Sequence, residues 1–518
     1  MGTSNIALGK VGPSVPYVID DRETPRFRVH RSTMVDEAIL EEERRLIFDK
    51  SWLFVGHESE IENPHDFRTR NVGGRPIIFT RNAEHKVKVF VNSCPHRGMQ
   101  IETRGEGHGR FLKCFYHGWS FNTNGDLVAL PGEDSYGPDF DRHNLCLVQP
   151  SKVESYRGFV FLSWTSEIAD LETYLAGSAD ILDLFADQSE QGMQIIGGSH
   201  LYAANANWKL LSENSADGYH AMTTHHRYLS MLKESGKDLS TVFKAGTAPN
   251  LGYDLGNGHA VIGGADATGG MNTGLGRDIS GEALSKQMSR RERFAELYGA
   301  DWANRMFSGR NLVIFPNLAV VDLIMGITLR TYYPISPGYM EVTAWSLQPK
   351  DDDPELRRMR QENFLTFWGP AGLATPDDIE ALERCQRGFA AHAVAPWNDI
   401  SRGMGSEKKI FTDELQMRTF WREWDRRMTG TEHPPEVSPI LRSGRVGLPG
   451  QIHQEPTVVD TRLLSGVASN GTASVEAASV EAASVEPASV EAASVEPASV
   501  EGSTVDADSV RASLGGGA

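Results

Sequence analysis

Residues 94–98 read CPHRG and residues 114–119 read CFYHGW, and these two stretches decide the fold of the segment around them. The first stretch contains a Cys-x-His pair and the second a Cys-x-x-His pair. Thiolates and imidazoles are common metal ligands. Two such pairs, each with a glycine close behind, predict two loops that hold one metal centre between them.

The four donors of these loops fit two kinds of centre; they are Cys94, His96, Cys114 and His117. Zinc takes two thiolates and two imidazoles as a closed structural site. A Rieske-type [2Fe-2S] cluster takes the same set, with the cysteines on one iron and the histidines on the other. A zinc finger normally pairs cysteine with cysteine and histidine with histidine, whereas each stretch here supplies one of each. The spacing therefore favours the cluster, while zinc and a metal-free core stay open.

Short β-branched and aromatic runs surround the two loops. They include RPIIFTRN at 75–82, KVKVFVNS at 86–93 and RGFVFLSW at 157–164. Turn signals separate several of these runs, and Asn124-Gly125 is a strong hairpin signal. We predict a small all-β module around the metal centre.

The longer part of the chain that follows mixes strands and helices. Strands are predicted within 311–335 and 340–349, and helices within 377–392 and 411–428. Strand and helix runs are partly segregated, so the predicted class is α+β. The glycine-dense segment 252–276 has no GxGxxG between a strand and a helix, and we interpret it as a mobile loop.

Residues 451–518 are predicted to form a disordered acidic tail. From Ala473 to Gly502 the unit ASVEx is repeated six times. A period of five matches neither a helix nor a strand, and Pro487 and Pro497 interrupt any helix. The small, acidic composition without aromatic residues is typical of a solvated chain.

Charge and composition exclude several classes of function. The formal net charge of −18, without a basic stripe, argues against nucleic-acid binding. No apolar run reaches the ~18 residues of a membrane span, and residues 1–21 lack the pattern of a secretory signal. Four cysteines in 518 residues do not make a disulfide framework. We therefore expect a cytoplasmic protein.

A second constellation lies in ENSADGYHAMTTHHRY at residues 213–228. In one continuous helix, His220 and His225 would lie ~7.5 Å apart along the axis and ~140° apart in rotation. Both rings could therefore reach one ion only if the helix bends or ends there. His226 is an alternative ligand, and surface or capping histidines are the alternative interpretation.

A third ligand for this second centre has to come from far along the chain. Asp377 and Asp378 follow a Gly/Pro-rich loop at the start of a predicted helix. Carboxylates there are ordinary caps, favoured by the helix dipole. One of them could also complete a set of two histidines and one carboxylate, the facial triad of non-heme iron(II).

Together these motifs resemble the large (α) subunit of Rieske non-heme iron aromatic-ring-hydroxylating dioxygenases. The resemblance covers residues 20–450 and is carried by CPHRG…CFYHGW, by NWKLLSENSADGYHAMTTH and by GPAGLATPDDIEALERCQRG. It implies a Rieske domain at 51–165, inserted between residues 1–50 and 166–450 of a larger catalytic domain. That domain would have an antiparallel sheet with flanking helices, in a helix-grip-like arrangement.

The resemblance also implies roles for individual residues. Cys94, His96, Cys114 and His117 would hold the [2Fe-2S] cluster, and His220, His225 and Asp378 the mononuclear iron. The family's spacing prefers His225 to His226 and Asp378 to Asp377. Asp217 would connect His220 to His117 of the partner subunit, which implies a homotrimer of α subunits, with or without a small β subunit.

The implied reaction adds both atoms of O2 to an aromatic ring and gives a cis-dihydrodiol, with electrons from a ferredoxin or flavin reductase. The spacing of Asn214 and Asp217 resembles the branch that acts on benzoate, cumate, phthalate and salicylate, so an aromatic carboxylate is the expected substrate. Neutral arenes, a Rieske monooxygenase, and an electron-transfer or zinc-structured binding protein are the alternatives. Candidate residues beside the iron ligands or in the substrate pocket are Asn214, Phe307, Phe364 and Arg310, with Arg387 as a second candidate for a carboxylate.

Overall fold

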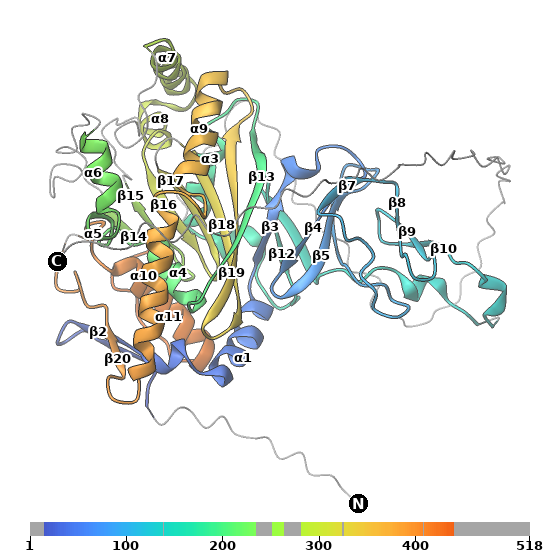
Figure 1. Cartoon of the computed structure of the whole chain (residues 1–518), viewed down its shortest axis with the longest axis horizontal. Helices are drawn as coiled ribbons and strands as arrows, with labels where there is room; N and C mark the ends of the chain where they lie inside the picture. The colour runs from blue at the N-terminus through green and yellow to red at the C-terminus, as the bar shows by residue number, and fades with distance from the viewer. Residues whose placement is uncertain are drawn as a thin grey trace, which may run out of the picture. The chain divides into compact units, whose positions relative to one another are not determined.

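The computed structural model describes residues 15–137, 139–234, 251–263, 281–323, 326–407 and 409–439 (Figure 1). The predicted tail at 451–518 lies outside the described residues, as does most of the glycine-dense segment. Among the described helices, none is long and apolar enough to cross a membrane.

Antiparallel strands build the segment that carries the two cysteine–histidine loops. A four-stranded sheet has the order β6-β5-β4-β7, and three-stranded sheets have the orders β10-β9-β8 and β11-β12-β3. The strands are β3 Leu53–His57, β4 Asp66–Val72, β5 Arg75–Arg81, β6 Val87–Val91, β7 Glu106–His108, β8 Phe111–Lys113, β9 Ser120–Asn122, β10 Leu127–Ala129, β11 Lys152–Tyr156 and β12 Phe159–Ser163. The all-β prediction for this segment is confirmed.

The Asn124-Gly125 turn joins β9 to β10 as its sequence predicts. Gly125 has a φ of +90°, and a side chain there would collide with the ring of Phe90. Phe90 belongs to a small buried core with Phe67, Trp119 and Phe121, and this core also contains Cys94 and Cys114. The core therefore holds the two cysteine-bearing loops against one another.

A seven-stranded antiparallel sheet forms the centre of the larger part, in the order β13-β19-β18-β17-β16-β15-β14. Its strands are β13 Met193–Ala204, β14 Leu251–Asp254, β15 Ala260–Gly263, β16 Arg310–Ile314, β17 Leu318–Leu323, β18 Gly326–Ser336 and β19 Tyr339–Pro349. The strand predictions in 311–335 and 340–349 are confirmed, and so is the α+β class.

The loop prediction for 252–276 is wrong where the structure describes that segment. β14 and β15 pair with each other, and β15 pairs with β16, so the segment forms the edge of the sheet. Apolar residues of β15 are buried in this edge, including Val261 and Ile262. The high glycine content hid this short apolar run.

Helices cover both faces of the large sheet. One face carries α4 Trp208–Ser215, α9 Pro354–Thr366, α10 Thr375–Gly388 and α11 Leu415–Thr429, and Figure 1 shows α9, α10 and α11 crossing in front of the strands. The other face packs against α2 Leu171–Leu175, α3 Ser178–Ala186, α7 Gly281–Tyr298 and α8 Ala300–Met306. Side chains alternate between the two faces along each strand. Leu329 of β18 packs in the core under α2, α3, α7 and α8, whereas Tyr332 packs in the core under α4 and α11.

The N-terminal segment packs with the helices of the first face. β1 Val18–Asp21 and β2 Arg26–His30 form a sheet with β20 Trp397–Asp399. In α1 Glu37–Leu46, the fully buried Glu43 accepts hydrogen bonds from Lys209, Trp208 and Trp424. Because a buried carboxylate needs such partners, this network ties α1 to α4 and α11. Short 3-10 turns complete the fold: η1 Arg31–Met34, η2 Phe48–Lys50, η3 Glu58–Ile61, η4 Glu133–Ser135, η5 Arg142–Leu145 and η6 Phe389–Ala391.

Candidate metal centres

The helical segment that carries the two histidines is broken at both of them. After α4 ends at Ser215, a short helix α5 spans Ala221–Thr224 and α6 spans His226–Glu234. His220 lies at the N-terminal end of α5, and His225 lies between α5 and α6. These interruptions bring both rings to one side, which a continuous helix could not do.

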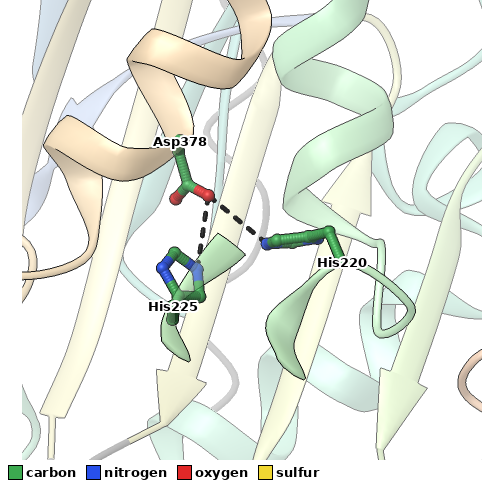
Figure 2. A group of neighbouring side chains, drawn as sticks. All are labelled: His220, His225 and Asp378. Carbon is green, nitrogen blue, oxygen red and sulfur yellow. Dashed lines mark ion pairs between the residues drawn. The ribbon is translucent and has the colours of Figure 1, made fainter. Parts of the chain in front are cut away.

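Asp378 lies in the first turn of α10, directly after Pro376 and Asp377. Its Oδ1 is 3.3 Å from Nε2 of His220 and 3.3 Å from Nε2 of His225 (Figure 2). Among the residues that the structure describes, these three are the group whose ligand atoms lie within 4.8 Å of one another. We call His220, His225 and Asp378 the trio.

The donor atoms of the trio fit a divalent metal of the first transition row. Bond lengths of about 2.1 Å place neighbouring ligand atoms about 3 Å apart, close to the two 3.3 Å distances. Two imidazoles and one carboxylate on one side of an ion are the facial set of non-heme iron(II). The residues therefore fit the mononuclear iron that the sequence suggests.

Electrostatics hold the trio together even without an ion. Asp378 is only 4% exposed; burial raises the pKa of its carboxyl, but the two histidines outweigh burial and lower it. For His220, burial lowers the pKa, while Asp217 and Asp378 raise it to about 10. With this raised pKa, the His220 ring is protonated at neutral pH, and a metal ion must displace a ring proton when it binds.

Two further residues from the sequence prediction lie beside the trio. Nδ1 of His220 is 3.0 Å from Oδ2 of Asp217, so this carboxylate orients the ring whose Nε2 faces Asp378. Asn214, at the end of α4, donates from Nδ2 to Oδ1 of Asp378 at 3.1 Å and lies 3.5 Å from Nε2 of His220.

The alternative ligands occupy other positions. His226 is exposed at the start of α6. Oδ2 of Asp377 lies 3.8 Å from Nδ1 of His225, the ring nitrogen that faces away from Asp378. The geometry therefore brings His225 and Asp378 together, whereas Asp377 lies beyond hydrogen-bonding distance of His225.

The two cysteine–histidine loops have matching backbones. The amide of Gly98 donates to the carbonyl of Cys94 at 2.8 Å, and the amide of Gly118 donates to that of Cys114 at 3.0 Å. Both glycines have positive φ, 73° and 77°, which side chains disfavour. Each glycine thus lets its loop turn sharply behind the ligand pair.

Across the two loops, like donors face like. The rings of His96 and His117 are 4.4 Å apart, and Trp119 stacks on His96 at 4.9 Å. Cys94 and Cys114 are both buried and neighbour each other; burial, followed by the contact with Cys114, raises the pKa of the Cys94 thiol. A cysteine side and a histidine side are the arrangement that a Rieske cluster requires.

The pocket residues proposed from the sequence lie in different places. Phe364 belongs to a buried cluster with Phe367, whose ring centroid is 6.3 Å from that of His225. Phe307 packs on Phe294 in the core of the opposite sheet face. The structure therefore brings Phe364, and not Phe307, toward the trio.

Arg310 is likewise directed away from the trio. It is two residues before Leu312 on β16 and therefore shares its face, which packs in the core that contains Phe307. Its guanidinium donates to the carbonyls of Arg305 and Ser308. Arg387, the second candidate, pairs with Glu380 and Glu383 at the exposed end of α10. Neither arginine meets the trio, and both have protein partners.

Sequence reasoning missed a different buried arginine. Arg330 of β18 is 3% exposed and lies 3.4 Å from Oγ of Ser215, the neighbour of Asn214. Only the register of the sheet distinguishes Arg330 from Arg310, because both stand among apolar residues in strands. No sequence signal identifies it, because strand parity relative to Leu329 does not say which face of the sheet holds the trio.

Comparison with known families and proteins agrees with this geometry. A model described as "Rieske [2Fe-2S] domain" matches residues 51–156, and one described as "Ring hydroxylating alpha subunit (catalytic domain)" matches residues 195–430. These matched ranges contain the two loops and the trio, respectively.

Several characterised dioxygenase subunits are similar over most of their length. The 2-halobenzoate 1,2-dioxygenase large subunit of Burkholderia cepacia is 32% identical over 398 residues, covering 74% of this chain and 82% of that protein. The toluate 1,2-dioxygenase subunit alpha of Pseudomonas putida is 34% identical over 406 residues, covering 74% and 84%. A solved naphthalene 1,2-dioxygenase with indole in its active site has a TM-score of 0.68 and 25% identity, covering 78% of this chain and 93% of that one.

Proposed function

The chain belongs to the family of ring-hydroxylating dioxygenase α subunits, and from this premise we propose that it dihydroxylates an aromatic carboxylate. Enzymes of this family carry a Rieske [2Fe-2S] cluster and a mononuclear iron, and they use O2. The observation that carries the proposal is the convergence of His220, His225 and Asp378 within 4.8 Å.

We assign the ligands of both centres on this basis. The cluster is held by Cys94 and Cys114 on one iron and by His96 and His117 on the other. The mononuclear iron would be held by the trio, whose two imidazoles and one carboxylate suit the oxygen chemistry of non-heme iron(II).

The proposed reaction converts an arene, O2, two electrons and two protons into a cis-dihydrodiol, with both oxygen atoms on adjacent ring carbons. The iron centres, when bound, supply the electrons and the oxygen chemistry. The chain's own residues prepare the site: Asp217 sets the orientation of His220, Asn214 holds Oδ1 of Asp378, and burial keeps water from the carboxylate.

An aromatic acid is the proposed substrate class for two reasons. The two relatives described above are named for a halobenzoate and for toluate. The three-residue spacing from Asn214 to Asp217 resembles that of the aromatic-acid branch. A neutral arene is the alternative substrate.

The proposed assembly is a homotrimer of α subunits in the cytoplasm, with or without a small β subunit. Two features of Asp217 support a role in electron transfer within such a ring: its Oδ2 lies 3.0 Å from Nδ1 of His220, and its side chain is 18% exposed. The proposed route continues to His117 of the partner subunit. A ferredoxin, a flavin reductase or both deliver the electrons to the cluster.

The test is incubation of the reconstituted full-length enzyme with reductase, ferredoxin and a panel of aromatic acids and neutral arenes, followed by mass analysis. We expect cis-dihydrodiols from one or more aromatic acids. Products carrying a single added oxygen, or products from neutral arenes alone, would contradict the proposal.

A further inference from the structure

We propose that Arg330 binds the carboxylate of the substrate, together with the Tyr202 hydroxyl and the Trp368 indole N–H. This inference rests on the proposed oxidation of an aromatic acid and names the group that recognises the acid. Arg330 thus replaces Arg310, the arginine that the sequence indicated as the carboxylate-binding candidate.

The register of the large sheet directs Arg330 to the face that carries the trio. Arg330 of β18 pairs with Ala319 of β17 and with Ala344 of β19, and Ala344 pairs in turn with His200 of β13. Directly paired residues share a face. The two alanines leave the long arginine side chain without bulky neighbours along this row.

Within the part of the chain that the structure describes, Arg330 is a buried cation without a paired anion. Its Nη2 lies 3.4 Å from Oγ of Ser215, and its Cζ lies 5.4 Å from the centroid of the Trp368 ring. Its Nε has no hydrogen-bond partner, and no carboxylate of the described residues forms an ion pair with it. A stacking ring offsets only part of the cost of burying a guanidinium, which normally demands a paired anion.

Two other buried donors beside Arg330 also lack acceptors in the described part of the chain. They are the hydroxyl of Tyr202 and Nε1 of Trp368. Burial raises the pKa of Tyr202, the nearby Arg330 lowers it, and Asp378 raises it further, so Tyr202 lies near both charges. Guanidinium, phenol and indole N–H together form a donor-rich set that matches the acceptor-rich carboxylate.

Pairs of neighbouring residues connect Arg330 to the trio. Ser215, which contacts Arg330, is adjacent in sequence to Asn214, which contacts Asp378. Phe367 and Trp368 are consecutive: the first faces His225 and the second faces Arg330. A flat ring can therefore lie along these aromatic side chains, with its carboxylate on Arg330 and its adjacent carbons toward the trio.

Arg310 provides a matched control because it is equally buried and also has a guanidinium nitrogen, Nη1, without a hydrogen-bond partner, but it lies on the opposite face of the sheet. It is 3% exposed, and its Nη2 donates to two backbone carbonyls. Burial lowers the pKa of Arg310 to about 10, while the neighbouring Asp322 raises it. Its replacement should disturb stability without changing how the enzyme discriminates among substrates.

The experiment compares Arg330→Met, Arg330→Lys and Arg310→Met with wild type in the reconstituted full-length enzyme. Binding of benzoate and of its neutral analogue benzamide is measured by calorimetry, and KM and kcat are measured for each compound that is oxidised. For Arg330→Met we expect the benzoate-to-benzamide affinity ratio to fall at least about tenfold, because the bidentate charged contact is lost. Arg330→Lys should lose less, and Arg310→Met should keep the wild-type ratio.

The outcomes separate this inference from the proposed function. If wild type oxidises an aromatic acid but Arg330→Met keeps the wild-type affinity ratio, the role of Arg330 is wrong and the proposed function stands. If wild type oxidises only neutral arenes, the proposed substrate class is wrong. Should Arg330→Met not fold, Arg330→Gln, which keeps a polar side chain but removes the charge, would overturn the assignment if it kept the wild-type benzoate-to-benzamide ratio.

Discussion

Each ligand of the trio is placed by a different local feature of the chain. His220 starts a short helix, His225 occupies the break before the next helix, and Asp378 lies in the first turn of α10. The helix N-terminus also favours the carboxylate of Asp378, because the exposed amides there carry partial positive charge. His220 and His225 lie about 150 residues before Asp378 in the sequence, so no short motif contains the whole site.

At the residue scale, Asp378→Ala is expected to remove one centre and keep the other. Without its shared carboxylate the trio loses a ligand, whereas the cysteine–histidine loops belong to a separate core. Iron content should fall from about three atoms per chain to about two, and product formation should be lost. Iron assay with electron paramagnetic resonance of the reduced cluster measures both. Loss of the cluster signal, or unchanged iron, would contradict the assignment.

Asp217→Asn tests the proposed route of electrons. Asparagine keeps an oxygen that can accept from the amide of Tyr219, which Oδ1 of Asp217 does at 2.6 Å, but it removes the charge that pairs with His220. We expect both iron centres to remain and the rate of product formation to fall about 10- to 100-fold. Single-turnover measurements on the fully reduced enzyme supply the readout, and a rate near wild type would refute the bridging role.

At the element scale, much of the architecture could be predicted because hydrophobic alternation and turn signals are local. The Asn124-Gly125 hairpin and the strands of β16–β19 are examples. The edge strands β14 and β15 were missed because glycines dilute a short apolar run whose partner, β16, lies about 50 residues later. Arg330 was missed because one register step separates the two faces of a strand, and sequence alone does not say which face holds the site.

The helix α4 carries a buried acid that makes stability depend on pH. Burial raises the pKa of Glu213 to about 7, although Trp421 donates a hydrogen bond to its Oε1 at 2.6 Å. The folded state therefore binds this proton more tightly than the unfolded state. Its stabilising contribution is complete below the unfolded pKa, near 4.5, and is lost as pH rises through about 7.

Glu213→Gln should remove this dependence while keeping an acceptor for Trp421. Relative to wild type, the free energy of unfolding of the variant should increase by roughly 2–3 kcal/mol between pH 5 and pH 8. Denaturant unfolding at both pH values measures the change. Parallel pH profiles for wild type and variant would show that Glu213 does not titrate in this range.

At the scale of the whole molecule, the fold separates electron supply from oxygen chemistry. The cluster loops belong to a small β core, and the trio belongs to the helix-covered face of the large sheet. The proposed cluster ligands could be predicted from sequence because each pair is contained in one loop. The proposed carboxylate-binding residues could not, because Arg330, Tyr202 and Trp368 come from three segments that meet only in the folded protein.

The most direct test of the account is one turnover of the fully reduced enzyme with benzoate under 18O2. If both centres work as proposed, the product is a cis-dihydrodiol that carries two labelled oxygen atoms from one O2 molecule, and Asp378→Ala forms none. A product with one labelled atom, or equal product from wild type and Asp378→Ala, would contradict the central claim.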